Sequence, residues 1–225
     1  MATFVMVHGA GDVGWYWHLT AAELGRRGHD VVAPDLPCDD DAAGLLEYRD
    51  TVLDAIGARG ELVVVAQSAG AFTAPLVCER RTVDLIVLVA GLVPKPGEAP
   101  NDWWANTGYE PVRGDWWGDE AATFYHDVTP ELAAEALRRG RRQSDTPGEQ
   151  PWPLARWPDV PTRFLLCRDD RLLPAEFLRR VVRERLGIVP DEIDGGHCVA
   201  LSRPKELAAR LDGYQTSQVT QLAPG

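Results

Sequence analysis

The sequence lacks long apolar runs and an excess of positive charge, and we expect neither a membrane-spanning segment nor a secretion signal. No apolar run approaches the roughly 20 residues that a transmembrane helix needs. The N-terminus enters an apolar run without a basic segment or a small-residue cleavage site. The formal net charge of -11 disfavours nucleic acids and anionic membranes as partners, because like charges repel. We therefore expect a cytoplasmic protein that binds neither nucleic acid nor membrane.

Cysteine is also scarce and is not arranged in pairs. The four cysteines, Cys38, Cys78, Cys167 and Cys198, lie far apart and form no C-x-x-C motif. Neither they nor the five histidines cluster at the spacing of metal ligands. A chain of 225 residues can bury a sizeable core without disulfides. We therefore expect free thiols, mostly buried, and no bound metal.

The chain does contain a regular alternation of short apolar runs and helix-compatible segments. The apolar runs predict strands at residues 3–7, 30–34, 62–67, 83–90, 162–167 and 188–193. Amphipathic segments predict helices at residues 15–27, 42–58, 174–186 and 203–211. This order is typical of an α/β fold with a mostly parallel central sheet and helices on both faces. The polar residues after Gly213 predict a flexible tail over 214–225.

The alternation stops between residues 94 and 161. This segment is rich in proline at both ends, has no strand pattern, and contains six of the eight tryptophans. Helix-compatible stretches occur at residues 119–126 and 130–142. Because so long a connection is usually functional, we expect a helical cap over a core formed by residues 1–93 and 162–213. Tryptophans that face a cleft would favour an apolar ligand, and the others would pack the cap onto the core.

The most informative stretch is residues 62–71, where an apolar run ends at Ser68. Small residues, Ala66 and Gly70, stand two positions before and two after this serine, and a helix-compatible segment at 72–80 follows. The pattern indicates a sharp strand-to-helix turn that holds the serine in a strained conformation above the sheet edge. Backbone N–H groups at the start of the helix would then face a developing anion. The alternative interpretation is a buried serine that caps a helix.

A base and an acid are expected at the same edge of the sheet, since the carboxyl ends of parallel strands meet there. Asp169 and Asp170 follow the predicted strand at 162–167, and His197 follows the one at 188–193. We prefer Asp170 as the acid, because it lies at the apex of the loop into the next helix, and keep Asp169 as the reserve. The chain order of serine, acid and histidine is that of the α/β-hydrolase fold, and differs from those of chymotrypsin and subtilisin.

The motifs resemble those of α/β-hydrolases, in particular the small group of plant methylesterases and hydroxynitrile lyases together with related bacterial esterases. The resemblance extends from Phe4 to about Leu211, and its carriers are residues 7–11 with Trp15 and Trp17, residues 28–36, 66–70, 167–170 with Pro174, and 195–197. It implies Ser68 as the nucleophile, His197 as the base and Asp170 as the orienting acid. It also implies an oxyanion hole formed by the backbone N–H groups of Ala10 and Ala69.

The resemblance further implies a small-molecule substrate and no cofactor. The residues that we expect to contact this substrate are Gly11, Trp17, Trp103 and Trp104. The chain departs from the family in two places: Ala66-Gln67 stands where the family usually has Gly-His, and Pro75 falls inside the helix after the nucleophile. Proline should remove a helical hydrogen bond and kink that helix. Both departures are expected to reshape the wall of the pocket.

The resulting hypothesis is a serine hydrolase that cleaves a small, largely apolar carboxylic ester through an acyl-enzyme. One alternative is a C–C lyase of the hydroxynitrile type. The resembling lyases have threonine after the first-loop histidine and lysine after the catalytic histidine, where this chain has Gly9 and Cys198. The other alternative is a receptor that holds a small apolar ligand on the same fold. The sequence does not fix the oligomeric state, and a homodimer stays open.

Overall fold

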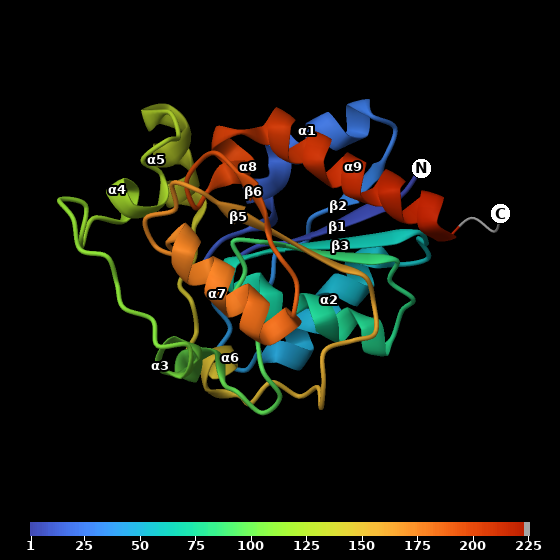
Figure 1. Cartoon of the computed structure of the whole chain (residues 1–225), viewed down its shortest axis with the longest axis horizontal. Coiled ribbons are helices and arrows are strands. Elements are labelled where there is room, and N and C mark those ends of the chain that lie inside the picture. Colours follow the sequence, from blue (N-terminus) through green and yellow to red (C-terminus); the bar gives the residue numbers. More distant parts are fainter. Residues whose placement is uncertain (223–225) are drawn as a thin grey trace.

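A computed structural model, which describes residues 1–222, contains one six-stranded parallel sheet between two layers of helices (Figure 1). The strands are β1 (Thr3–Val7), β2 (Asp30–Val32), β3 (Leu62–Gln67), β4 (Leu85–Val89), β5 (Thr162–Cys167) and β6 (Asp191–Ile193). Their order in the sheet is β2-β1-β3-β4-β5-β6, and every neighbouring pair is parallel. The carboxyl ends of all the strands therefore meet at one edge, as the sequence predicts.

The central strands are buried along their whole length. Every residue of β1, β3 and β4 is buried, which is why these strands read as continuous apolar runs instead of alternating ones. Side chains still alternate between the two faces: Val64 packs in one core cluster, whereas Val63 and Val65 pack in the other. The sheet therefore has a separate apolar core on each side.

Different helices cover the two faces (Figure 1). One face carries α1 (His18–Arg26), α8 (Val199–Ser202) and α9 (Pro204–Leu222), and the opposite face carries α2 (Leu45–Ile56) and α7 (Ala175–Leu186). None of the described helices is both long and apolar enough to cross a bilayer. The four cysteines are free thiols, and three of them are buried, as expected.

Two helix predictions need correction. The single helix expected at 72–80 is instead a pair of short 3-10 helices, η2 (Ser68–Phe72) and η3 (Ala74–Glu79). Pro75, at the start of η3, has no N–H to continue a helical ladder from the preceding turn. The helix predicted to end at 211 continues to Leu222, and Tyr214 packs against the core within the expected tail. The last three residues of that tail, 223–225, lie outside the described part of the chain.

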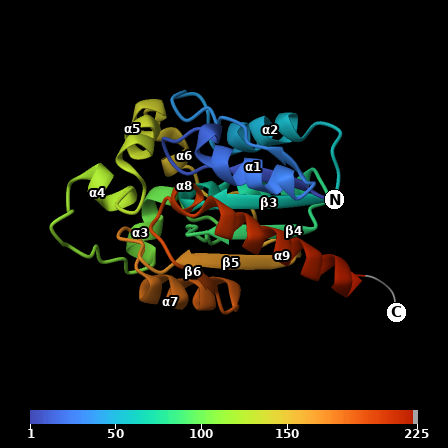
Figure 2. The ribbon, with the colours of Figure 1, turned by 90° about the horizontal axis from the view of Figure 1, so that it is seen from above.

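The long connection between β4 and β5 forms a group of short helices. They are η4 (Pro100–Asp102), α3 (Trp103–Asn106), α4 (Glu120–Phe124), α5 (Pro130–Arg139) and α6 (Thr146–Glu149). Residues 94–161, all of which the structure describes, contain no strand. Figures 1 and 2 show α3, α4 and α5 at the end of the sheet that is opposite both termini. Since β1 starts at the N-terminus, this is the carboxyl-end edge of the strands.

A buried ion pair fastens this connection to α7. Arg185 donates from Nη2 to Glu98 Oε1 at 2.8 Å, and the two side chains are 2% and 3% exposed. Arg185→Met should destabilise the fold by about 3–5 kcal/mol, because the Glu98 carboxylate would stay buried without its partner. Urea unfolding measures this free energy. The double variant Glu98→Gln/Arg185→Met should regain much of the loss, and a single variant as stable as the wild type would contradict the account.

Candidate active site

Ser68 lies in a strained turn directly after β3. Its φ of 51° is in the left-handed region, which L-residues rarely adopt. Two residues after the serine there is no room for a side chain, because a Cβ on Gly70 would lie 2.6 Å from the carbonyl oxygen of His8. Ala66, two residues before the serine, is fully buried in the apolar core, so its methyl group is accommodated. The strand and the sharp turn therefore follow one another as predicted, and the 3-10 helices η2 and η3 stand in place of the predicted helix.

The loop after β1 passes directly over this serine. A Cβ added to Gly9 would lie 3.1 Å from Ser68 Cβ and 2.4 Å from Gln67 Oε1, so a larger residue there would require the Gln67 side chain to move. Gln67, one of the departures from the family pattern, donates from Nε2 to the carbonyl oxygen of His197 at 3.4 Å. The glutamine thus connects the end of β3 to the loop that carries the histidine.

Asp170 and His197 form a buried hydrogen-bonded pair. His197 Nδ1–H donates to Asp170 Oδ2 at 2.7 Å, and the two side chains are at most 3% exposed. The other carboxylate oxygen, Oδ1, accepts the backbone N–H groups of Leu172 at 2.8 Å and Leu173 at 2.9 Å. With both oxygens engaged, the carboxylate has a fixed orientation. It holds the imidazole so that Nε2 is the ring nitrogen left for other chemistry.

The reserve candidate, Asp169, has a different place. Its Oδ2 accepts the N–H of Gly195 at 3.1 Å, and its own N–H donates to the Gly195 carbonyl at 3.0 Å. Gly196 N–H donates to Asp127 Oδ2 at 2.8 Å, and Asp127 comes from the connection between β4 and β5. The glycine loop before the histidine is therefore fixed from both sides. Asp127 was not predicted from the sequence, where no motif distinguishes it.

The buried His8 braces the loop after β1. His8 Nδ1–H donates to the Gly9 carbonyl at 2.8 Å, and His8 Nε2 accepts the N–H of Leu36 at 2.9 Å. One ring nitrogen donates and the other accepts, which requires the neutral imidazole. Burial lowers the pKa of His8 to about 4, so the ring stays neutral at ordinary pH.

The same loop is also held by the connection between β4 and β5. Gly11 N–H donates to Gln143 Oε1 at 2.9 Å, and Arg141 N–H donates to the Gly11 carbonyl at 2.7 Å. Gln143 in turn donates from Nε2 to the Tyr48 hydroxyl at 3.1 Å. The N–H of Ala10 has no hydrogen-bond partner among the described residues. A loop held at Gly11 thus carries a free backbone donor, at Ala10, in the lining of the cavity that Ser68 also lines.

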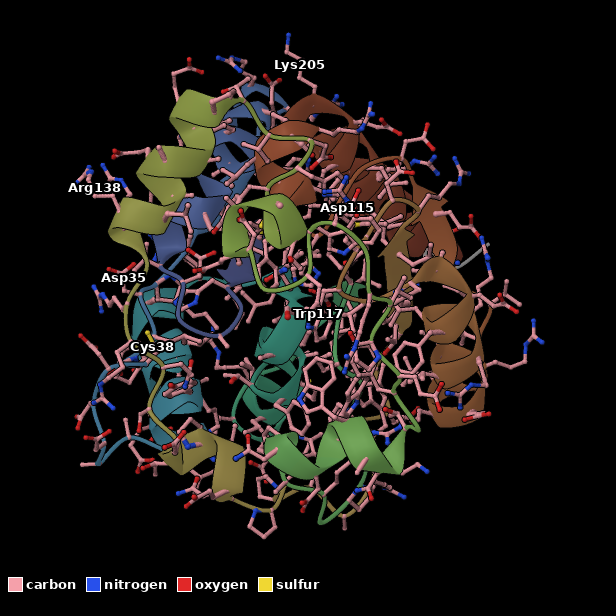
Figure 3. The ribbon with its side chains drawn as sticks, turned by 90° about the vertical axis from the view of Figure 1, so that its left-hand side faces the viewer. Asp35, Cys38, Asp115, Trp117, Arg138 and Lys205 are labelled. Atoms are coloured by element: carbon pink, nitrogen blue, oxygen red, sulfur yellow. The ribbon has the colours of Figure 1, made fainter. Side chains whose placement is uncertain are left out.

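Ser68 and His197 line one cavity of about 580 Å³. The core contributes its floor, including Ala10, Ala69 and Gln67, and the connection between β4 and β5 contributes an apolar wall. The apolar side chains of this wall are Trp104, Phe124, Tyr125, Ala136 and Leu137. The same connection also lines the cavity with polar residues, namely Asn101, Glu120, Arg141, Gln143, Ser144 and Asp145. Figure 3, viewed from this end, shows the loop with Asp115 and Trp117 at the centre of the face, between α3 and α4.

The four predicted substrate contacts divide into two that line the cavity and two that do not. Gly11 and Trp104 line the cavity. Trp17 and Trp103 are fully buried and lie outside its lining. Trp17 faces the core beneath α1, and Trp103 donates from Nε1 to the Val93 carbonyl at 2.9 Å. In the part of the chain that the structure describes, no three His, Cys, Asp or Glu side chains gather as metal ligands would.

Comparison with known proteins finds one consistent group. A model of the alpha/beta hydrolase family matches residues 4–210. Methylesterase 7 of Arabidopsis thaliana is 25% identical over 92% of this chain and 94% of its own length. Salicylic acid-binding protein 2 of Nicotiana tabacum is 25% identical over 92% and 95%. The structure of polyneuridine aldehyde esterase has a TM-score of 0.80 at 18% identity, covering 95% of this chain and 99% of that one. A pyrethroid hydrolase has a TM-score of 0.79 at 19% identity, covering 97% and 99%.

Proposed function

Because this chain belongs to the alpha/beta hydrolase family, we propose that it is a serine esterase that cleaves small, largely apolar carboxylic esters. The observation that carries the proposal is the buried 2.7 Å bond between His197 and Asp170, at the cavity that Ser68 also lines. The names of similar proteins, among them a methylesterase and polyneuridine aldehyde esterase, support this reaction class. The apolar wall from the connection between β4 and β5 suits an apolar substrate.

In the proposed reaction Ser68 is the nucleophile and His197 the base. Since Nδ1–H is committed to Asp170, Nε2 can accept the proton of the Ser68 hydroxyl as Oγ attacks the ester carbonyl. The imidazolium then protonates the departing alkoxide as the C–O bond breaks, which leaves an acyl group on Ser68. Water repeats the same steps on the acyl-enzyme, releases the acid and restores the serine.

The developing oxyanion is assigned to the backbone N–H groups of Ala10 and Ala69. Both residues line the cavity, and the Ala10 N–H has no partner within the described chain. A positioned donor of this kind stabilises the transition state by about 3 kcal/mol. The strained Ser68 backbone and the bracing of the first loop by His8 hold the two donors in place before substrate binds.

The hydroxynitrile-lyase alternative is not favoured. Gly9 has no hydroxyl where the resembling lyases place threonine. Cys198 stands in the place of their lysine, and a thiol cannot carry the positive charge of a lysine. Burial raises the pKa of the Cys198 thiol well above its usual value, so the side chain is neutral. The names of the similar proteins also point to ester chemistry.

Turnover tests the proposal directly. Purified protein is incubated with p-nitrophenyl acetate, butyrate, hexanoate and octanoate, and the released alcohol and acid are both measured. We expect saturable hydrolysis that favours the shorter chains, and no cyanide release from mandelonitrile. A receptor would bind such esters without multiple turnovers, and absence of turnover across the whole panel would contradict the esterase proposal.

Gln143 should act as a positioning residue for the first loop. Gln143→Leu removes the acceptor of Gly11 N–H and is expected to lower kcat for p-nitrophenyl butyrate about five- to tenfold, with a smaller change in KM. Gln143→Glu keeps the acceptor oxygen and should retain most of the activity. Equal loss of kcat in both variants, at equal thermal stability, would contradict a positioning role.

A further inference from the structure

Asp12, on the first loop, is a carboxylate that the proposed reaction does not use. It is partly buried, lies two residues after Ala10 and lines the same cavity as Ser68. Its Oδ1 accepts the N–H of Val13 at 2.8 Å. Its Oδ2 has no hydrogen-bond or ion-pair partner within residues 1–222. One carboxylate oxygen in the cavity wall is therefore available to a ligand.

No arginine or lysine in the part of the chain that the structure describes forms an ion pair with this carboxylate. Among the described residues that line the cavity, the one arginine is Arg141, and there is no lysine. Arg141 is already paired: Nη2 lies 2.9 Å from Asp35 Oδ2, and Nη1 lies 3.8 Å from Asp39 Oδ1. Burial raises the pKa of Asp12 to about 6, against the opposing effects of the Val13 N–H and of His197. The carboxyl is therefore mostly ionised at neutral pH, and an unpaired, partly buried charge is unfavourable.

The surroundings of Asp12 suit a positively charged group. The aromatic side chains of Phe124 and Tyr125, from the end of α4, line the same cavity, and aromatic faces attract cations. The chain also carries a formal net charge of -11, and a cavity with acidic walls concentrates cations. The acid that ester hydrolysis releases is itself an anion, so the same carboxylate would favour its departure.

We propose that Asp12 binds an ammonium group of the substrate, and that the preferred esters carry an amine or a quaternary ammonium on an otherwise apolar body. This inference rests on the proposed esterase function and adds to it the class of substrate. Asp12 Oδ2 would supply the negative charge opposite the ammonium group. The rings of Phe124 and Tyr125 would cover the apolar faces of the cation.

Pairs of isosteric esters test the proposal. In each pair one ester ends in a trimethylammonium group and the other in a tert-butyl group, with one pair altered on the acyl side and one on the alcohol side. We expect kcat/KM to favour the cation by about tenfold or more in at least one pair, since charge-assisted contacts are strong. In Asp12→Asn the ratio of kcat/KM for the cationic ester to kcat/KM for its neutral partner should fall towards one. The ratio is taken within one enzyme, so a general loss of activity cancels.

A matched variant controls for net charge. Glu131→Gln removes the same unit charge from an exposed position on α5, outside the cavity lining, and should leave the ratio unchanged. A wild-type ratio of one or less in both pairs would overturn the proposal. A preference for the cation that survives Asp12→Asn would overturn it as well.

The pH dependence gives a second readout. The groups that interact electrostatically with Asp12 are His197, Asp35, Tyr16, Tyr125, Cys38 and Cys198. Burial raises the pKa of the two tyrosines and of the two cysteines, so these four stay neutral near neutral pH. Trimethylammonium does not titrate, and His197 acts equally on both esters of a pair. The ratio should therefore rise as pH increases through about 6, where Asp12 ionises, and a flat ratio would contradict the proposal.

Binding separates this inference from the esterase proposal. Calorimetric titration of the trimethylammonium ester into Ser68→Ala should show saturable binding that is lost in Ser68→Ala/Asp12→Asn. If the wild type cleaves no ester but this binding is seen, the esterase proposal fails and the ammonium site stands. If esters are cleaved without preference and the double variant binds as well as the single one, the ammonium site fails and the esterase stands.

Discussion

Ser68→Ala is expected to lower kcat for p-nitrophenyl butyrate by about 10⁴- to 10⁶-fold, to near the uncatalysed rate. The substitution removes the attacking oxygen and leaves the rest of the cavity in place. Because alanine is as small as serine and differs by one atom, the strained turn at φ 51° should fold with nearly unchanged stability. Steady-state kinetics on protein purified in parallel with the wild type measures the loss.

The control for Ser68→Ala is thermal unfolding of the same preparation, which should match the wild type. A fluorophosphonate probe should label the wild type and not the variant. A variant that keeps even a hundredth of the wild-type rate, in a preparation shown to be free of other esterases, would remove Ser68 from the proposed role.

Asp170→Asn is expected to lower kcat about 10³- to 10⁴-fold with little change in KM. The amide can still accept the N–H groups of Leu172 and Leu173 through its oxygen. Its NH₂ group would then face His197 Nδ1 and donate to it, which moves the imidazole proton to Nε2. In that tautomer Nε2 cannot take the proton of the serine, so the base is lost although the geometry is kept.

The adjacent aspartate supplies a matched control for Asp170→Asn. Asp169→Asn keeps an oxygen that can accept Gly195 N–H and touches the histidine only through the glycine loop, so we expect less than about tenfold loss of kcat. Both variants replace an aspartate by an asparagine, and the two substituted residues are neighbours in the chain. Equal losses in both would contradict the assignment of Asp170 as the orienting acid.

The placement of the candidate site could be predicted because parallel strands end at a common edge. Ser68, Asp170 and His197 each follow a short apolar run, and the alternation of strands and helices fixes the direction of those runs. The small residue at Gly70 could also be predicted from the sequence. The end of β1 approaches this position so closely that it leaves no room for a side chain.

Other features depend on contacts that no local pattern reveals. Trp17 and Trp103 share their residue type with Trp104, and only packing decides which of them reaches the cavity. The contacts of Gln143 and Asp127 join residues far apart in the sequence: Gln143 reaches Gly11, and Asp127 reaches Gly196. Neither belongs to a motif.

The unpaired state of Asp12 was hidden for a related reason. The glycine-rich loop that contains Asp12 is visible in the sequence, but the sequence does not show that Arg141 is engaged by Asp35 and Asp39. A charged residue can be judged paired or unpaired only once its spatial neighbours are known. The same holds for Tyr214, whose packing against the core carries α9 beyond Gly213.

Trapping the covalent intermediate tests the central claim most directly. Protein mixed with p-nitrophenyl butyrate is quenched in acid during the first turnover, and the peptides are mapped by mass spectrometry. One butyryl group is expected per chain, on the peptide that contains Ser68, and it should be absent from Ser68→Ala. A butyryl group on another residue, or rapid turnover with no acylated protein under conditions where deacylation is slowed, would contradict the serine acyl-enzyme.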